Sequence, residues 1–338
     1  METLEIALQL SAMMTFSFNR QALLLRTDFS VAGAICFLST NSEGVLRAAE
    51  RWKKAQPRAQ AKSFQMDIFV DAALDVEGMQ RAHFRGLRHL VWVALPPRGL
   101  ITYDLLRRRV RAVLTLRAAS DLAFWDSLLL PVTIGILGTT MGVAPLHCAC
   151  LDQDGSALLV AGASGAGKST LAAALGKRGF GVVSDDWTYL TLGESGLIAH
   201  GLEAPIKLLP DTTRFFSELE KFALRITLNG EEAYEVDARR ELGFAVKEMT
   251  EPKWMFFLER STAPGCRMIP CRAEYVKGFF EQIAERLPEE LPQAKVSRSK
   301  VIQKLSECPA WILHTGESPQ ATAAAVDHFL AERRNEYA

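Results

Sequence analysis

Nine consecutive residues near the middle of the chain constrain its fold more than any other feature. Residues 162–170 read GASGAGKST and fit the phosphate-binding pattern G-x-x-x-x-G-K-[ST] in full. The glycines let the backbone curl so that successive N–H groups point at one spot, which the positive end of the next helix also faces. The motif therefore predicts a strand, a glycine-rich turn and a helix that together hold the phosphates of ATP or GTP.

The residues on either side of the motif have the patterns that it needs. Residues 157–161 (ALLVA) form a short apolar run, which is typical of a buried strand. Residues 168–177 (KSTLAAALGK) are rich in helix formers, and Gly179 follows as a stop signal. In this arrangement Lys168 reaches the β- and γ-phosphates, and the Ser169 hydroxyl holds Mg²⁺.

Two adjacent aspartates, Asp185 and Asp186, end the strand predicted over residues 181–184. On its own, an Asp-Asp pair is more typical of a solvated turn or a helix cap. A strand that follows the loop helix, however, can return beside the loop strand through a right-handed crossover, which brings its carboxyl end to the phosphates. We therefore expect these carboxylates to supply the metal-binding and catalytic groups that the loop lacks.

Composition limits the classes of partner. The chain has 338 residues, enough for two domains, and 49% of them are apolar, so a large core is available. Its formal net charge is zero, which gives no electrostatic reason to expect a nucleic-acid or membrane-surface partner. The six cysteines show neither C-x-x-C pairs nor the spacing of a zinc site, so a reducing cytoplasm is the expected location.

One apolar stretch has the length of a membrane-spanning helix. Residues 127–146 (SLLLPVTIGILGTTMGVAPL) carry no charge. Two prolines, several glycines and the lack of a basic cluster on one flank make the stretch a poor span. We expect a buried helix that leads into the catalytic core, and no membrane partner.

Two domains are expected along the chain. Residues 1–118 have the pattern of a separate α+β domain, and residues 119–338 that of a P-loop domain. An Asp-Gly turn at 154–155 joins two apolar runs, which predicts a β-hairpin leading into the loop. The expected fold class is α/β with a mixed sheet. Further strands are expected over 66–70, 90–95, 187–192, 197–200, 205–209, 253–258 and 311–314, and helices over 44–54, 275–287 and 321–332.

These residues together resemble a known family. His147, the hairpin, the loop and the segment KRGFGVVSDD at 177–186 resemble the catalytic domain of HPr kinase/phosphorylase, and more closely the related kinases found beside peptide-biosynthesis genes. The likeness covers residues 146–192 well and the rest of the carboxyl half loosely. Because that family shares its core with phosphoenolpyruvate carboxykinases, the resemblance implies a mixed β-sheet P-loop kinase core. It also implies homo-oligomers, although the sequence has no readable oligomerisation motif.

The resemblance further implies ATP, Mg²⁺ and a hydroxyl acceptor, usually a serine of a protein or peptide. Ser169 and Asp185 are then candidate Mg²⁺ ligands, and one of Asp185 and Asp186 is the general base. His147 matches a histidine near that site, with a satisfied core histidine as the alternative. The candidate catalytic residues are Asp185, Asp186, His147 and Lys168. The candidate nucleotide-binding residues are Gly162, Ala163, Ser164, Gly165, Ala166, Gly167, Lys168, Ser169 and Thr170.

The sequence departs from the family after the aspartates. The second family signature, Glu-Ile-Arg-Gly-Leu-Gly, has no recognisable counterpart, which argues against phosphorylase activity and against HPr as the substrate. Glu203 and Lys207 lie in the corresponding region and are further candidates for lining the site.

Two other functions stay open. Small-metabolite kinases also place acids behind the loop, but their loop lies near the amino terminus of a parallel sheet. A nucleotide-binding switch or scaffold would use ATP to control a partner without phosphorylating it. A motor-type ATPase fits less well, because its second carboxylate motif lies much farther along the chain.

Overall fold

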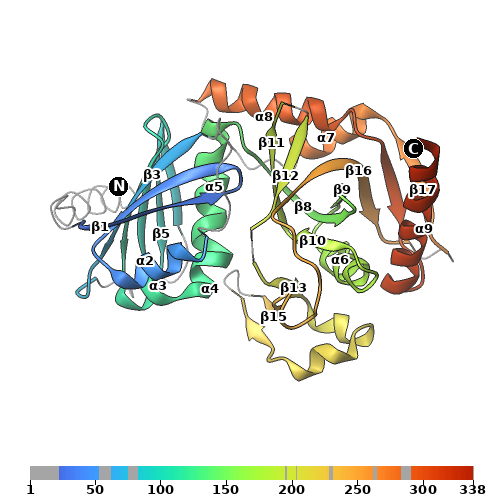
Figure 1. Ribbon diagram of the computed structural model, residues 1–338, viewed down its shortest axis with the longest axis horizontal. Helices are drawn as coiled ribbons and strands as arrows, with labels where there is room; N and C mark the ends of the chain where they lie inside the picture. Colours follow the sequence, from blue (N-terminus) through green and yellow to red (C-terminus); the bar gives the residue numbers. More distant parts are fainter. Residues whose placement is uncertain are drawn as a thin grey trace. The chain divides into compact units, whose positions relative to one another are not determined.

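The structure is a computed structural model and describes residues 23–52, 62–74, 83–194, 196–202, 204–227, 231–261, 265–282 and 291–337. The chain divides into two compact units (Figure 1). Unit 1 comprises residues 1–143 with 286–297, and unit 2 comprises residues 144–285 with 298–338. Both units contain helices and a sheet with parallel and antiparallel pairs, which confirms the expected mixed α/β class.

Unit 1 is built on one seven-stranded sheet of order β1-β2-β3-β7-β6-β5-β4. Strands β2, β3 and β7 pair in parallel, and the other neighbours are antiparallel. Alternate side chains such as Phe64, Met66 and Ile68 are buried on one face of the sheet. The strands are β1 Leu25–Val31, β2 Ala34–Thr40, β3 Ser63–Val70, β4 His83–Leu87, β5 Leu90–Leu95, β6 Gly99–Asp104 and β7 Arg109–Leu114. The helices are α2 Glu43–Glu50, α3 Leu116–Ser120, α4 Leu122–Phe124 and α5 Leu130–Leu137.

The apolar stretch singled out in the sequence is a helical run of unit 1. Leu122–Met141 is long and apolar enough to cross a membrane by length and composition, and 56% of its apolar window is buried in the structure. The run contains a π-helical turn, Trp125–Leu129, and ends in a 3₁₀ turn, Gly138–Met141. It therefore packs as a core helix of a folded unit does.

Two side-chain contacts hold this run within unit 1. Arg51 forms an ion pair with Asp126 at 2.9 Å, and the Tyr103 hydroxyl lies 3.3 Å from that of Thr133. Unit 1 consequently extends to Val143, later than the boundary between residues 118 and 119 that the sequence suggests.

In unit 2, the strands around the glycine-rich loop form a closed circuit of pairings. Strand β8 (Ala144–Gln153) pairs with β11 (Trp187–Leu192) through its first residues and with β9 (Ser156–Ala161) through its later ones. Strand β16 (Met249–Glu259) pairs with β12 (Leu197–His200) at its start and with β9 farther along. Since β11 also pairs with β12, the circuit β8-β9-β16-β12-β11 returns to β8.

The hairpin and the loop helix occur where the sequence places them. Strands β8 and β9 are antiparallel, and Asp154 and Gly155 both have positive φ in the turn between them. Helix α6 spans Lys168–Lys177, and β16 covers the predicted central strand. These predictions are confirmed. They could be made because the turn and helix signals each lie within a few consecutive residues.

Strand β10 (Gly181–Ser184) corrects one expectation. It pairs with β8 in antiparallel fashion, so β8 lies between β10 and the loop strand β9. Because β9 and β10 are both antiparallel to β8, they run in the same direction. The carboxyl end of β10 therefore still reaches the edge of the sheet at which the loop lies, although the two strands are not neighbours.

Helices cover both faces of the central sheet of unit 2. Residues of α6 and α9 form a core with side chains such as Val160, Phe256 and Leu313, and residues of α7 and α8 form a second core with Leu159 and Phe257. The elements are α7 Ala273–Gln282, α9 Pro319–Tyr337, β17 Arg267–Cys271 and β18 Ala310–His314, and α8 Pro292–Leu305 belongs to unit 2 from residue 298 onward. Residues 283–287 of the expected helix 275–287 lie outside the described residues.

A small three-stranded sheet follows β12 in the chain. It consists of β13 (Ile206–Leu208), β15 (Glu232–Val236) and β14 (Arg225–Ile226), with 3₁₀ turns at Pro210–Arg214 and Ser217–Lys221. Strand β13 brings Lys207 toward the aspartates.

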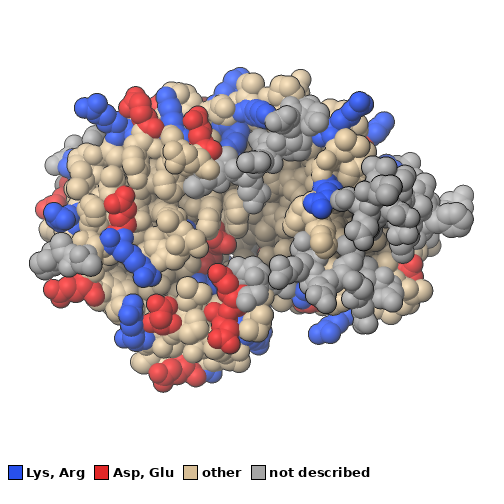
Figure 2. Space-filling view, turned by 180° about the vertical axis from the view of Figure 1, so that it is seen from behind, with Lys and Arg blue, Asp and Glu red and all other residues tan. Residues whose placement is uncertain are grey.

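The face shown in Figure 2 carries charges of both signs. Described lysine and arginine side chains occur on it together with those of aspartate and glutamate. This agrees with the formal net charge of zero.

Candidate functional site

The loop between β9 and α6 contains glycines with positive φ. Gly165 and Gly167 have φ of +74° and +105°, values that side-chain-bearing residues rarely adopt. Residues 163–165 are exposed, so the loop is open to a ligand. The first N–H groups of α6 have no partner within the helix and lie at its positive end. The loop can therefore hold an anion with backbone donors.

Lys168 is the buried cation of this site. Its Nζ donates to the carbonyl oxygens of Gly162 at 3.1 Å and Ala163 at 3.3 Å. Burial lowers the pKa of its ammonium, and Asp186 and Asp185 offset part of this shift. The ammonium thus lies within electrostatic range of both aspartates.

Asp185 is buried, and its carboxylate has hydrogen-bond donors within the protein. Its carboxylate accepts a hydrogen bond from the backbone N–H of Lys207 at 2.9 Å and another from the Ser169 hydroxyl. Burial and the neighbouring charge of Asp186 raise its pKa from 3.8 to about 7, while these hydrogen bonds lower it in part. Ser169 and Asp185, the two candidate metal ligands, are therefore in contact.

Asp186 differs from its neighbour in exposure and in partner. Its side chain is 50% exposed, and its Oδ1 lies 2.7 Å from Nε2 of His147, whose side chain is 36% exposed. Burial opposes its ionisation, but the hydrogen bond with His147 and the charge of Lys168 hold its pKa below the ordinary value. The two aspartates thus have different environments, one enclosed and one open.

The fold brings together all four candidate catalytic residues. His147 comes from β8, Lys168 from the start of α6, and the aspartates from the turn between β10 and β11. The His147 side chain is 36% exposed, so it is not enclosed in the core.

Lys207 and Glu203 are the two further candidates for lining the site. Lys207 places its backbone N–H on Asp185, and its Nζ forms an ion pair with Glu231 at 2.5 Å. Glu203 lies outside the described residues. The sequence suggested Lys207 only by its position after the aspartates, because the contact depends on the distant pairing of β13 with β15.

The donor set suits Mg²⁺. The Ser169 hydroxyl and the Asp185 carboxylate offer the oxygen atoms that Mg²⁺ prefers. Burial raises the pKa of Asp185, so a cation would stabilise its charged form. Within the described part of the chain, no three His, Cys, Asp or Glu side chains form a metal site of their own. Few protein ligands are what Mg²⁺ needs when phosphates and water complete its shell.

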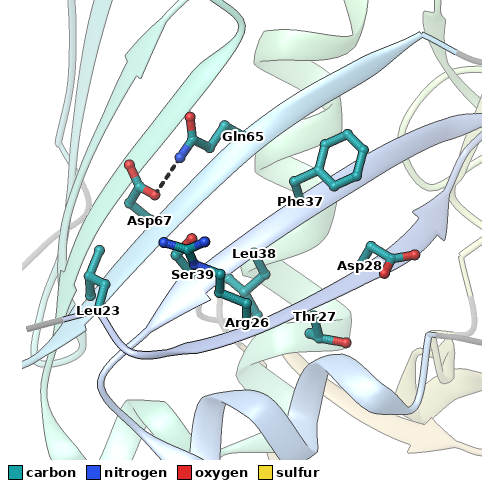
Figure 3. Close-up of a pocket in the computed structure, with 9 residues that line it drawn as sticks. All are labelled: Leu23, Arg26, Thr27, Asp28, Phe37, Leu38, Ser39, Gln65 and Asp67. Atoms are coloured by element: carbon teal, nitrogen blue, oxygen red, sulfur yellow. Dashed lines mark hydrogen bonds between the residues drawn. The ribbon is translucent and has the colours of Figure 1, made fainter. Parts of the chain in front are cut away.

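A separate cavity of about 720 Å³ lies on the sheet of unit 1. Figure 3 shows Arg26, Phe37, Ser39 and Gln65 around it, with Gln65 donating to Asp67 at 3.0 Å. It is lined entirely by unit 1 and contains none of the predicted site residues. Its lining mixes charged, polar, aliphatic and aromatic side chains.

Comparison with solved structures finds distant structural similarity. No family model matches the chain, and no curated protein matches it. Among solved structures, the chain is similar to the HPr(Ser) kinase/phosphatase from Coxiella burnetii, with a TM-score of 0.30 and 14% sequence identity. The match covers 57% of this chain and 93% of that chain. A similarity at this TM-score does not identify a function, which has to be argued from the residues of this chain.

Proposed function

We propose that this chain is a kinase that transfers the γ-phosphoryl group of ATP to a hydroxyl, with a serine of a peptide or protein as the acceptor. The observation that carries the proposal is the meeting of Lys168, Ser169 and the Asp185–Asp186 pair at one end of the loop helix. A phosphate-binding loop alone would suit any nucleotide-binding protein. A half-exposed carboxylate beside it adds a group that can orient and deprotonate an acceptor hydroxyl.

The two aspartates have separate roles in this proposal. Asp185, enclosed and in contact with Ser169, would hold Mg²⁺, which would supply positive charge to the phosphates. Asp186 is open enough to meet the acceptor, so it is the base. Its low pKa is compatible with that role, since phosphoryl transfer proceeds through a loose transition state in which positioning matters more than basicity.

Lys168 and the loop provide the remaining charge. In the structure the ammonium of Lys168 rests on the carbonyls of its own loop. On nucleotide binding, it exchanges these neutral acceptors for phosphate oxygens, which form the stronger, charge-assisted hydrogen bonds.

The proposal is tested by incubating the purified protein with γ-labelled ATP, Mg²⁺ and an extract of its own cells. We expect label on a peptide or protein with the wild type. Lys168→Ala should lose both nucleotide binding and transfer. Asp186→Asn should keep nucleotide binding but lose transfer by about 100-fold or more. Lys300→Ala, which removes an exposed lysine of α8, is the matched control and should behave as the wild type.

The other outcomes separate the alternatives. Label in a small-molecule fraction would indicate a metabolite kinase. Tight ATP binding with label released only as free phosphate, or not at all, would indicate a nucleotide-controlled switch. Wild-type turnover by Lys168→Ala would refute a role for the loop.

A further inference from the structure

Two side chains contact the imidazole of His147. Its Nε2 meets Oδ1 of Asp186 at 2.7 Å, and its ring stacks on the indole of Trp187. The ring centroids are 5.4 Å apart and the planes are inclined by 20°. These values lie in the range of favourable offset stacking between aromatic rings. Trp187 therefore limits the tilt of the imidazole that contacts Asp186.

Backbone pairing fixes this stack. Trp187 is the first residue of β11 and lies directly opposite His147 in the antiparallel register with β8. Side chains of directly opposed residues lie close enough to interact across the two strands. The stack is thus built into the sheet rather than formed by a mobile loop.

Thr188 anchors the same turn from the opposite face. Its hydroxyl donates to the carbonyl of Cys148 at 2.8 Å and lies 2.6 Å from the hydroxyl of Ser184. All three residues are buried. Because these bonds span both sides of the Asp185–Asp186 pair, the backbone that carries Trp187 has little freedom to shift.

We propose that Trp187 is a positioning residue, which acts through His147 to fix the orientation of the Asp186 carboxylate toward the acceptor hydroxyl. This inference rests on the proposed kinase function. Removing the indole frees the imidazole to rotate, and Asp186 then samples orientations that miss the acceptor. Nucleotide binding, which depends on the loop and Lys168, stays unchanged.

A double-mutant cycle tests this role. Trp187→Leu should lower kcat for the acceptor by about tenfold, with unchanged ATP affinity. Trp187→Phe keeps a ring for stacking and should retain most of the rate. In a His147→Ala background, Trp187→Leu should have less than a twofold further effect, since its partner is already gone. Trp52→Leu, at a half-buried tryptophan of unit 1, is the control and should leave kcat unchanged.

A measurement without turnover separates this inference from the kinase proposal. The imidazole N–H that binds Asp186 should give a downfield proton NMR signal that disappears in His147→Ala. We expect this signal to broaden or vanish in Trp187→Leu and to persist in Trp187→Phe. An unchanged signal in Trp187→Leu would overturn the positioning role whatever the acceptor is. Equal losses of kcat from Trp187→Leu in the wild-type and His147→Ala backgrounds would overturn it as well.

Discussion

The carboxylate of Asp185 is buried beside the like charge of Asp186. Its ionised form therefore destabilises the folded protein when no metal is bound. Its pKa rises from 3.8 to about 7 because of burial and the charge of Asp186. The folded chain therefore binds a proton at Asp185 over a pH range in which the unfolded chain has released it. By linkage, this group makes the folded state less stable as the pH rises from about 4 to about 7. Above that range, its full destabilising effect is present.

Asp185→Asn should remove this dependence. The amide keeps the size and much of the hydrogen bonding of the side chain but carries no charge. In the absence of nucleotide and metal, we expect the variant to unfold at a higher temperature than the wild type at pH 8, and the difference to shrink toward pH 4. Since one pKa unit corresponds to about 1.4 kcal/mol, the gain at pH 8 is on the order of a few kcal/mol.

Thermal unfolding of both proteins in metal-free buffer between pH 4 and 8 measures this effect. A variant Asp185→Asn that is less stable than the wild type at pH 8 would contradict the inferred charge burial.

A short motif singles out individual residues as candidates. The sequence names the loop residues and both aspartates as candidates, because their spacing and order have a direct physical meaning. The 2.7 Å contact of His147 with Asp186 could not be predicted, because His147 and Asp186 meet only through the pairing of β8 with β11. The role of Trp187 was missed for the same reason. An aromatic residue at the start of a strand signals packing, and nothing in the sequence shows its ring against His147.

At the scale of elements, short-range signals again gave the reliable predictions. The Asp-Gly turn predicted the β8–β9 hairpin, and helix formers predicted α6. The placement of β10 was wrong by one strand, because local sequence does not say whether a returning strand docks beside β9 or beyond β8. The closed circuit through β16 and β12 joins segments about 50 residues apart, and such long-range pairings leave no local pattern.

Gly201, just after β12, lies against the backbone of β10 close to the site. A Cβ at this position would lie 1.7 Å from the carbonyl oxygen of Val183, only two residues before Asp185. Backbone must therefore move to admit any side chain. We expect Gly201→Ala to destabilise unit 2 by about 1–3 kcal/mol or more and to displace Asp185.

Denaturant unfolding and ATP binding of Gly201→Ala check this prediction. Gly278→Ala is the matched control, because a Cβ at Gly278 in α7 meets nothing within 4 Å. Helix propensity alone should then stabilise that variant by up to about 1 kcal/mol. If Gly201→Ala kept the stability and the ATP affinity of the wild type, the close approach of Gly201 to Val183 would not be required for either property.

At the scale of the whole molecule, the proposed chemistry belongs to one of the two units. Every residue of the candidate nucleotide site belongs to unit 2, whose two apolar cores surround the central sheet. The sequence suggested two units from composition and pattern alone. It did not show that the helical run up to Met141 belongs with unit 1, because an apolar helix can pack equally well on either neighbour in sequence.

Nucleotide should therefore stabilise unit 2 in particular. A ligand that binds only the folded state adds about 2.7 kcal/mol at 100 times its Kd, or roughly 5 to 10 °C in the unfolding temperature of a unit of this size. Pulsed hydrogen exchange during heating follows each unit separately. With MgATP, we expect peptides from β9 and α6 to stay protected to higher temperature. Lys168→Ala should show no such shift, because it lacks the cation that holds the phosphates. An equal shift in Lys168→Ala, or one restricted to the β2 and β3 peptides of unit 1, would place the nucleotide elsewhere in the chain.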